Sequence, residues 1–174
     1  MSEDGTLQAG EIALRRAESN DLPRVVALQQ AAYARNRALL GVEPIPLQAD
    51  YAAIMRDMEV WCADGDRRLA GALILEPRVD DLLIWSIATD PGAQGAGLGR
   101  SLLSAAEDRA RQLGRPVLRL YTGTLLTHLV GWYGRHGYAV ERIEILSDRS
   151  ITHMIKHLGC EHGEKDHAAK EQRP

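Results

Sequence analysis

The chain of 174 residues has few cysteines, little net charge and no long apolar run. Its two cysteines, Cys62 and Cys160, are too few for a disulfide framework, which indicates a reducing compartment. A formal net charge of -3 gives no general attraction to nucleic acid or to an anionic membrane. No apolar run approaches the roughly 20 residues of a membrane helix, and the N-terminus lacks the pattern of a signal peptide. We therefore expect a soluble, cytoplasmic protein.

The length suits one domain with a core that needs no cross-links. Residues 1–10 are polar with two glycines, and residues 160–174 are rich in charge. Neither end can bury enough apolar surface to offset the entropy lost on ordering. We predict flexible ends at 1–10 and 160–174 on either side of one domain over 11–159.

Hydrophobic periodicity and turn residues divide this domain into strands and helices. The strand at 82–88 is apolar on both faces apart from Ser86, so we expect it to lie centrally, with both faces covered. The expected helices are 22–40, 47–58, 100–113 and 125–135. The expected strands are 12–16, 60–63, 69–75, 82–88, 117–121, 139–146 and 152–158.

A glycine-rich stretch, Asp90 to Arg100, lies between the central strand and the helix that follows it. Glycines let the backbone approach a ligand without a Cβ in the way, and the first amides of a helix have no intrahelical acceptor. Those donors and the positive end of the helix dipole favour an anion such as a pyrophosphate. The stretch therefore predicts a phosphate-binding turn, the alternative being a tight turn that binds nothing.

The spacing of the glycines narrows the choice of ligand. The dinucleotide fingerprint G-x-G-x-x-G fails from either Gly95 or Gly97, because its last glycine would fall on an arginine or a leucine. The nucleoside-triphosphate loop fails because no lysine lies near the turn. The pattern Q-x-x-G-x-G does fit, at Gln94, Gly97 and Gly99. It resembles the coenzyme A loop of the GNAT superfamily, the acyl-CoA-dependent N-acyltransferases.

This resemblance implies an α/β (α+β) domain with the GNAT fold, a mixed central sheet of about six to seven strands flanked by about four helices. In that family the loop amides hold the pyrophosphate of acyl-CoA, and the preceding strand pairs with the pantetheine arm. Acetyl-CoA would therefore be the co-substrate, with an amine as acetyl acceptor. The implied cofactor-binding residues are Ile87, Ala88, Thr89, Gln94, Gly95, Ala96, Gly97, Leu98, Gly99 and Arg100.

A late segment, Y-G-R-H-G-Y from Tyr133 to Tyr138, also resembles the family. The tyrosine at the position of Tyr133 commonly protonates the departing thiolate of coenzyme A there. A phenol suits this task because its pKa, about 10 when unperturbed, is close enough to the thiol value of about 8.5. The resemblance therefore makes Tyr133 the candidate catalytic acid.

Tyr133 also has a purely structural interpretation. It shares one helical face with Leu126, Leu129 and Val130, so its ring could be ordinary core. Glycines at 131 and 134 inside the same helix instead suggest that something, such as a cofactor arm, packs close to the backbone.

A catalytic base is less clear from the sequence. Some family members have a glutamate on the strand before the loop, whereas Leu83 holds that position here. Glu76, Asp80 and Asp81 could deprotonate an amine through water, or could be solvated carboxylates at strand ends. An asparagine that often precedes the tyrosine in this family is absent from 126–132.

The resemblance places the acceptor beside the first two helices and their connecting loop. That region carries a mixture of charges, so small amines, protein amino groups and amino-bearing drugs stay open. The residues concerned are Tyr33, Arg37, Glu43, Pro44, Asp50 and Tyr51.

No metal site is expected. His153 and His157 are four residues apart in a predicted strand, which spans about 13 Å and is too far for one ion. His162 and His167 fall in the charged tail.

Two functions follow from these patterns. The first is an N-acetyltransferase that uses direct attack in a ternary complex, since no cysteine lies near the motif to act as nucleophile. The second is a non-catalytic acyl-CoA-binding regulatory module in which Tyr133 is structural. We favour the enzyme, because a binder has no need of the Tyr133 arrangement as well as the loop. A homodimer stays open.

Overall fold

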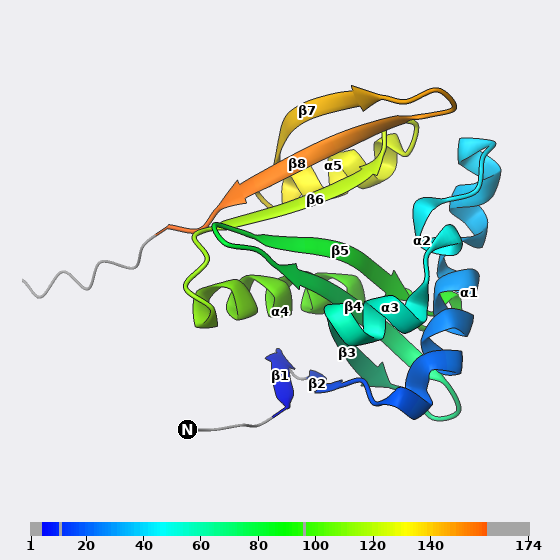
Figure 1. Cartoon of the computed structure of the whole chain (residues 1–174), viewed down its shortest axis with the longest axis vertical. Coiled ribbons are helices and arrows are strands. Elements are labelled where there is room, and N and C mark those ends of the chain that lie inside the picture. The colour runs from blue at the N-terminus through cyan, green and yellow to red at the C-terminus, as the bar shows by residue number, and fades with distance from the viewer. Residues whose placement is uncertain (1–4, 11, 96, 160–174) are drawn as a thin grey trace, which may run out of the picture.

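The computed structural model describes residues 5–10, 12–95 and 97–159. Two strands, a run of helices and a run of three strands come first, and strands and helices alternate over residues 82–145 (Figure 1). The strands are β1 (Thr6–Ala9), β2 (Ile12–Arg16), β3 (Glu59–Asp64), β4 (Leu69–Pro77), β5 (Leu82–Thr89), β6 (Val117–Gly123), β7 (Ala139–Ile145) and β8 (Ser150–His157). The α-helices are α1 (Leu22–Leu40), α2 (Ile45–Gln48), α3 (Tyr51–Asp57), α4 (Leu98–Gln112) and α5 (Thr127–Arg135).

All these strands join one mixed sheet of 8 strands, in the order β1-β2-β3-β4-β5-β6-β8-β7. Every neighbouring pair is antiparallel except β5 and β6, which run parallel. The predicted mixed α/β fold is therefore confirmed, with slightly more strands than expected and with β5 in a central position.

The structure describes part of the N-terminal segment that we expected to be flexible, and that part includes a strand. Residues 6–9 form β1, which pairs antiparallel with β2 and matches Leu7 to Leu14. The side chain of Leu7 is only 2% exposed because it packs in the core beside α4. One buried leucine and a strand ladder thus order a segment whose composition is mostly polar.

The second predicted helix, 47–58, is two short helices. The backbone of Ala49 is extended, and Asp50 begins α3 by accepting hydrogen bonds from the amides of Ala52 and Ala53 at 3.0 and 3.2 Å. An aspartate that caps a new helix satisfies amides that would otherwise lack partners, so the break is stable.

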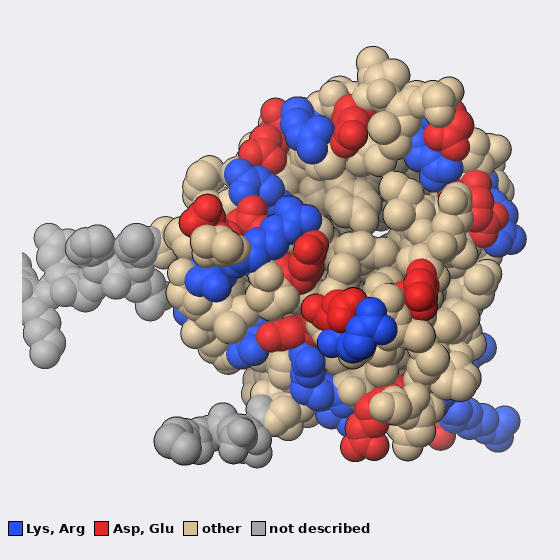
Figure 2. Space-filling model, viewed as in Figure 1, with Lys and Arg blue, Asp and Glu red and all other residues tan. Residues whose placement is uncertain are grey.

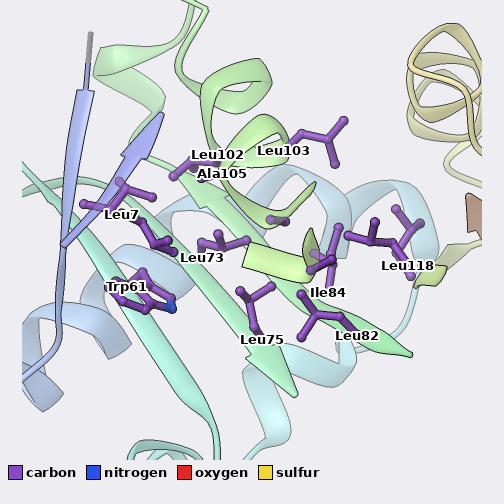
Figure 3. Close-up of a cluster of buried hydrophobic side chains, with 14 of the residues drawn as sticks. Leu7, Trp61, Leu73, Leu75, Leu82, Ile84, Leu102, Leu103, Ala105 and Leu118 are labelled. Atoms are coloured by element: carbon purple, nitrogen blue, oxygen red, sulfur yellow. The ribbon is translucent and has the colours of Figure 1, made fainter. Parts of the chain in front are cut away.

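Helices cover both faces of the sheet. On one face, Leu102 and Leu103 of α4 pack against Leu73 and Leu75 of β4 (Figure 3). On the other face, α1 and α3 bury their apolar residues against alternate residues of the same strands, among them Ile74. Both faces of the central strands are therefore covered as far as Ile84 of β5, as the apolar run in β5 predicted. Beyond it, Trp85, Ile87 and Thr89 are only partly buried.

The sheet splits between β5 and β6. These strands pair only from Leu82 and Leu118 to Ile84 and Leu120, although β5 pairs with β4 along its whole length. The register with β4 shifts just after Ile84, leaving Trp85 as an extra residue in a β-bulge. Because a bulge bends its strand, β5 diverges from β6 beyond this point, as Figure 1 shows.

The start of α1 is fixed by a cluster of charged groups around Asp21. The Asp21 carboxylate accepts hydrogen bonds from Arg15 at 2.6 and 2.9 Å, from Arg24 at 3.0 Å and from the Glu18 amide at 2.9 Å. Asp21 is 3% exposed, and the Arg15 guanidinium holds the pKa of its carboxyl well below its usual range.

Asp21→Asn should lower the free energy of unfolding by about 2 kcal/mol at neutral pH, the scale of lost hydrogen bonds to a charged group. The folded-state pKa is depressed, so this stability is present above the unfolded value of about 3.9 and is lost as the pH falls below it. Urea unfolding at pH 7 and pH 3 measures the difference, with the exposed Asp66→Asn as control. A penalty that stays the same in acid would contradict the ionic origin.

Candidate functional site

A cleft of about 660 Å³ lies where β5 and β6 diverge. Its walls come from α1, the segment 42–46, the ends of β5 and β6, the glycine-rich loop, α5 and the turn before β8. Figure 2 shows a hollow in this region of the surface, with charged side chains around it. The bulge at Trp85 therefore opens the cleft by bending β5 away from its neighbour.

Most of the predicted cofactor-binding residues lie on this cleft. Ala88 does not, because it is 1% exposed and packs in the core against α1 and α3. Ala96 lies outside the described residues. Those that line the cleft are Ile87, Thr89, Gln94, Gly95, Gly97, Leu98, Gly99 and Arg100.

The glycine-rich loop has the backbone that its sequence predicted. Gly95 and Gly97 have φ angles of 92° and 77°, in the left-handed region where a side chain is strained. Apart from the chain neighbours, no described heavy atom lies within 4 Å of the position that a Cβ would take at either residue. The loop therefore presents bare backbone to open space.

Two contacts hold this loop against the sheet. The Asp90 carboxylate accepts from the Gly92 amide at 2.7 Å and from Arg68 at 3.0 Å. At the start of α4, Leu98 packs so closely on Gly71 that a Cβ there would lie 3.1 Å from it. Gly97 occupies the N-cap of α4 without any side-chain cap, so the first helical amides stay available to a ligand.

The charged side chains of the cleft are all basic. Arg35, Arg100 and Arg135 line it and form no ion pair within the described part of the chain, although most other arginines do. Among the described lining residues there is no aspartate or glutamate. The cleft is therefore electrostatically suited to an anionic ligand.

Tyr133 lies on the wall formed by α5. Its ring packs edge-on against Trp132 at 5.0 Å and lies 6.0 Å from Tyr138, and it also contacts the core. Burial raises the pKa of the Tyr133 phenol, so the group stays protonated at neutral pH. A protonated phenol on the wall of the cleft can donate its proton to a basic group that binds there.

The carboxylates considered as bases lie elsewhere. Glu76 pairs with Arg78 at 2.9 Å, and Asp81 accepts a hydrogen bond from Arg119. Neither of them, nor Asp80, lines the cleft. Among the described residues, the cleft thus offers no carboxylate base.

Of the predicted acceptor residues, Tyr33 and Pro44 line the cleft. The others have structural roles, because Arg37 and Glu43 pair with each other at 2.6 Å and Asp50 caps α3. The buried Tyr51 donates its hydroxyl to the Pro46 carbonyl at 2.8 Å.

Sequence reasoning missed Trp85 and Tyr121, which line the cleft from the diverging parts of β5 and β6. It also missed a hydrogen-bonded chain from Tyr33 through Ser86 to the buried Gln29, with both links 3.1 Å long. Ser86 could have suggested this contact, because it is the one polar residue in an otherwise apolar strand.

Other kinds of site find no support in the described residues. No group of three or more histidine, cysteine or acidic side chains is placed to hold a metal ion there. In the same part of the chain, no helix has the length and apolar character needed to cross a membrane. His153 pairs with Glu144 at 2.7 Å, beside the Tyr121 ring.

A strand, a glycine turn and a helix N-terminus beside a split in a mixed sheet define an α/β protein with a cleft suited to an anionic ligand. Residues 22–138 match the acetyltransferase (GNAT) family, and the chain belongs to that family. The predicted membership is thereby confirmed.

Several known proteins resemble this chain. A mycothiol acetyltransferase from Sanguibacter keddieii is 35% identical over 69 residues, which are 40% of this chain and 21% of that relative. The chain thus matches only about a fifth of that relative's length.

Two solved structures share the fold. The PaiA N-acetyltransferase from Thermoplasma acidophilum, in complex with coenzyme A, has a TM-score of 0.66 at 18% identity, covering 85% of this chain and 99% of that one. A GNAT family acetyltransferase from Elizabethkingia anophelis with acetyl-CoA bound has a TM-score of 0.55 at 19% identity, covering 67% and 92%.

Proposed function

We propose that this protein is an N-acetyltransferase that moves acetyl from acetyl-CoA to an amine. The observation that carries the proposal is the uncapped N-terminus of α4, with its left-handed glycines, on the same cleft as a protonated tyrosine. Two solved relatives of the same fold hold coenzyme A or acetyl-CoA, which supports the choice of donor.

In this proposal the donor lies along the open edge of β5. The amides at the start of α4 bind the pyrophosphate, and Arg100 and Arg135 neutralise phosphate charge. Beyond Ile84 the edge of β5 has no partner in β6, so its backbone is free to pair with the pantetheine arm. The thioester then lies between β5 and β6, in reach of the α5 wall.

The chemistry is direct transfer. The neutral amine nitrogen attacks the thioester carbonyl, the C–S bond breaks as the tetrahedral intermediate collapses, and the Tyr133 phenol gives its proton to the departing thiolate. The amine loses its own proton to water, and bulk solvent returns a proton to the phenolate. The free Cys62 does not serve as an acyl carrier, because it is fully buried and burial raises its pKa to about 11.

A non-catalytic acyl-CoA-binding regulatory module remains the second candidate, since the glycine loop alone would serve it. Thiol release that requires both acetyl-CoA and an amine separates the two. We assign the acetyltransferase domain to residues 11–159 together with β1, and we infer a cytoplasmic location from the sparse cysteines and the free thiol of Cys62.

Acetyl-CoA at about one hundred times its Kd should stabilise the protein by about 2.7 kcal/mol, raising the Tm by about 5–10 °C for a chain of this size. NADH and ATP should give no comparable shift, because neither has a pantetheine arm to pair with β5. Thermal melts with each ligand measure this. Equal shifts for all three would mean that the loop recognises phosphate alone.

A further inference from the structure

Resting on the proposed function, we propose that the acetyl acceptor is an amine with an apolar body and no second positive charge. The end of the cleft away from the glycine loop carries this inference. Apolar and aromatic side chains make up much of its walls, its charged side chains are arginines, and no described lining residue there is acidic.

Contacts between distant segments build this end of the cleft. The Arg149 guanidinium, in the turn before β8, donates to the Glu43 carbonyl at 2.7 Å. Leu40, at the end of α1, packs closely on Gly123, because a Cβ there would lie 2.6 Å from a methyl group of Leu40 and would displace it. These contacts hold the segment after α1 against β6 and the turn before β8. Together they form the wall of the cleft opposite the glycine-rich loop.

Much of that wall is apolar, although Arg149 and Ser150 also line it. Leu40, Val42 and Ile45 line it from the α1–α2 side, and Ile151 lines it from β8. Trp85 lines it from the bulge, held edge-on by Tyr51 at 6.2 Å. Such a surface gains free energy by covering an apolar group and gains none by covering a charged one.

The acids of this region are already neutralised. Glu43 pairs with Arg37 at 2.6 Å and Asp148 pairs with Arg149 at 2.6 Å, and neither acid lines the cleft. Arg35 lines the cleft with no ion pair among the described residues, so the remaining field is positive. A second ammonium group on the acceptor would lose its hydration without gaining a counter-charge.

The reacting amine escapes this penalty, because it must be neutral before its nitrogen can attack. A second amine on the same molecule stays protonated at the pH of the reaction, since its pKa is close to that of lysine, about 10.4. The cleft therefore selects against diamines, polyamines and other polycations, and favours a monoamine whose carbon chain or ring covers the wall.

The decisive experiment compares hexylamine with 1,6-diaminohexane, which have the same chain length and differ in one terminal amine. We expect hexylamine to have a kcat/KM at least tenfold higher at pH 8, measured by thiol release from acetyl-CoA. Calorimetry with the coenzyme A-loaded protein should show the same preference in Kd. Val42→Glu places a carboxylate on the wall and should shift the ratio toward the diamine by about tenfold, while the matched neutral Val42→Gln should not.

The two readouts separate this inference from the proposed function. Equal use of both amines, or a preference for the diamine, overturns the inference while leaving the acetyltransferase intact. Tighter binding of hexylamine without any thiol release supports the selectivity of the cleft for a monoamine and contradicts the proposed acetyltransferase. Failure of both amines to bind the loaded protein overturns the inference, because an apolar wall should retain the six-carbon chain.

Discussion

Gly97→Glu should weaken acetyl-CoA binding by at least a hundredfold. Gly97 is the N-cap of α4, and the space beside it is open, so a glutamate side chain would occupy the volume proposed for the pyrophosphate. Its carboxylate would also satisfy the helix amides and dipole that the phosphate needs. Because an acidic group near a helix N-terminus is favourable for the helix itself, the fold should survive while the anion site is lost.

Two controls isolate the charge from the backbone strain in the Gly97 experiment. Gly97→Asn adds a side chain that tolerates a φ of 77° and carries no charge, so it should cost less than tenfold in affinity. Gly114→Glu puts the same glutamate at another left-handed glycine, at the C-terminal end of α4, and should affect stability only. Calorimetry measures Kd, and circular dichroism checks folding. A folded Gly97→Glu protein with unchanged affinity would refute the phosphate assignment.

The strand, the glycine-rich loop and the helix that follows it could be predicted from the sequence because their signals are local. An apolar run, closely spaced glycines and a helical period follow one another without interruption from Leu82 to Gln112. Each feature constrains the backbone within a few residues. Asp50 was a similar local signal for the start of α3, and treating 47–58 as one periodic helix overlooked it.

Strand β1 could not be predicted in the same way. Its order depends on Leu7 meeting the core beside α4, about a hundred residues later in the chain. The bulge at Trp85 is likewise a property of strand register, which composition does not encode. The sequence therefore placed the expected acceptor region beside the first two helices, but it gave no sign that Trp85 and Tyr121 line the cleft.

The sequence identified the charged residues near the expected acceptor site but not the ion pairs that they form. Arg37 and Glu43 looked like a mixed recognition surface, whereas in the structure they neutralise each other. Asp148 and Arg149 do the same at the turn before β8. Only the structure shows which charged residues pair with each other, and it leaves Arg35 on the cleft wall with no carboxylate among the described lining residues. The proposal of a monoamine acceptor rests on this lack of a carboxylate.

Tyr133→Phe should reduce kcat by about a hundredfold or more while leaving acetyl-CoA affinity nearly unchanged. The substitution keeps the ring against Trp132 and Tyr138 and removes only the hydroxyl proton. That proton is needed as the thiolate departs and not when the donor binds, so the loss falls on kcat. Burial raises the pKa of Tyr133, so the wild-type enzyme should also keep its acid through pH 9.

Tyr138→Phe is the matched control for Tyr133→Phe, because the neighbouring phenol is buried and its hydroxyl has no partner among the described residues. Removing that hydroxyl breaks no hydrogen bond, so both turnover and stability should be preserved. Turnover is measured with saturating amine, under conditions in which pre-steady-state kinetics show that chemistry limits the rate. If the two variants retain the same kcat, Tyr133 belongs to the core and the thiolate leaves unaided or takes its proton from water. If only Tyr133→Phe loses turnover, the ratio of the two kcat values gives the contribution of proton donation by Tyr133.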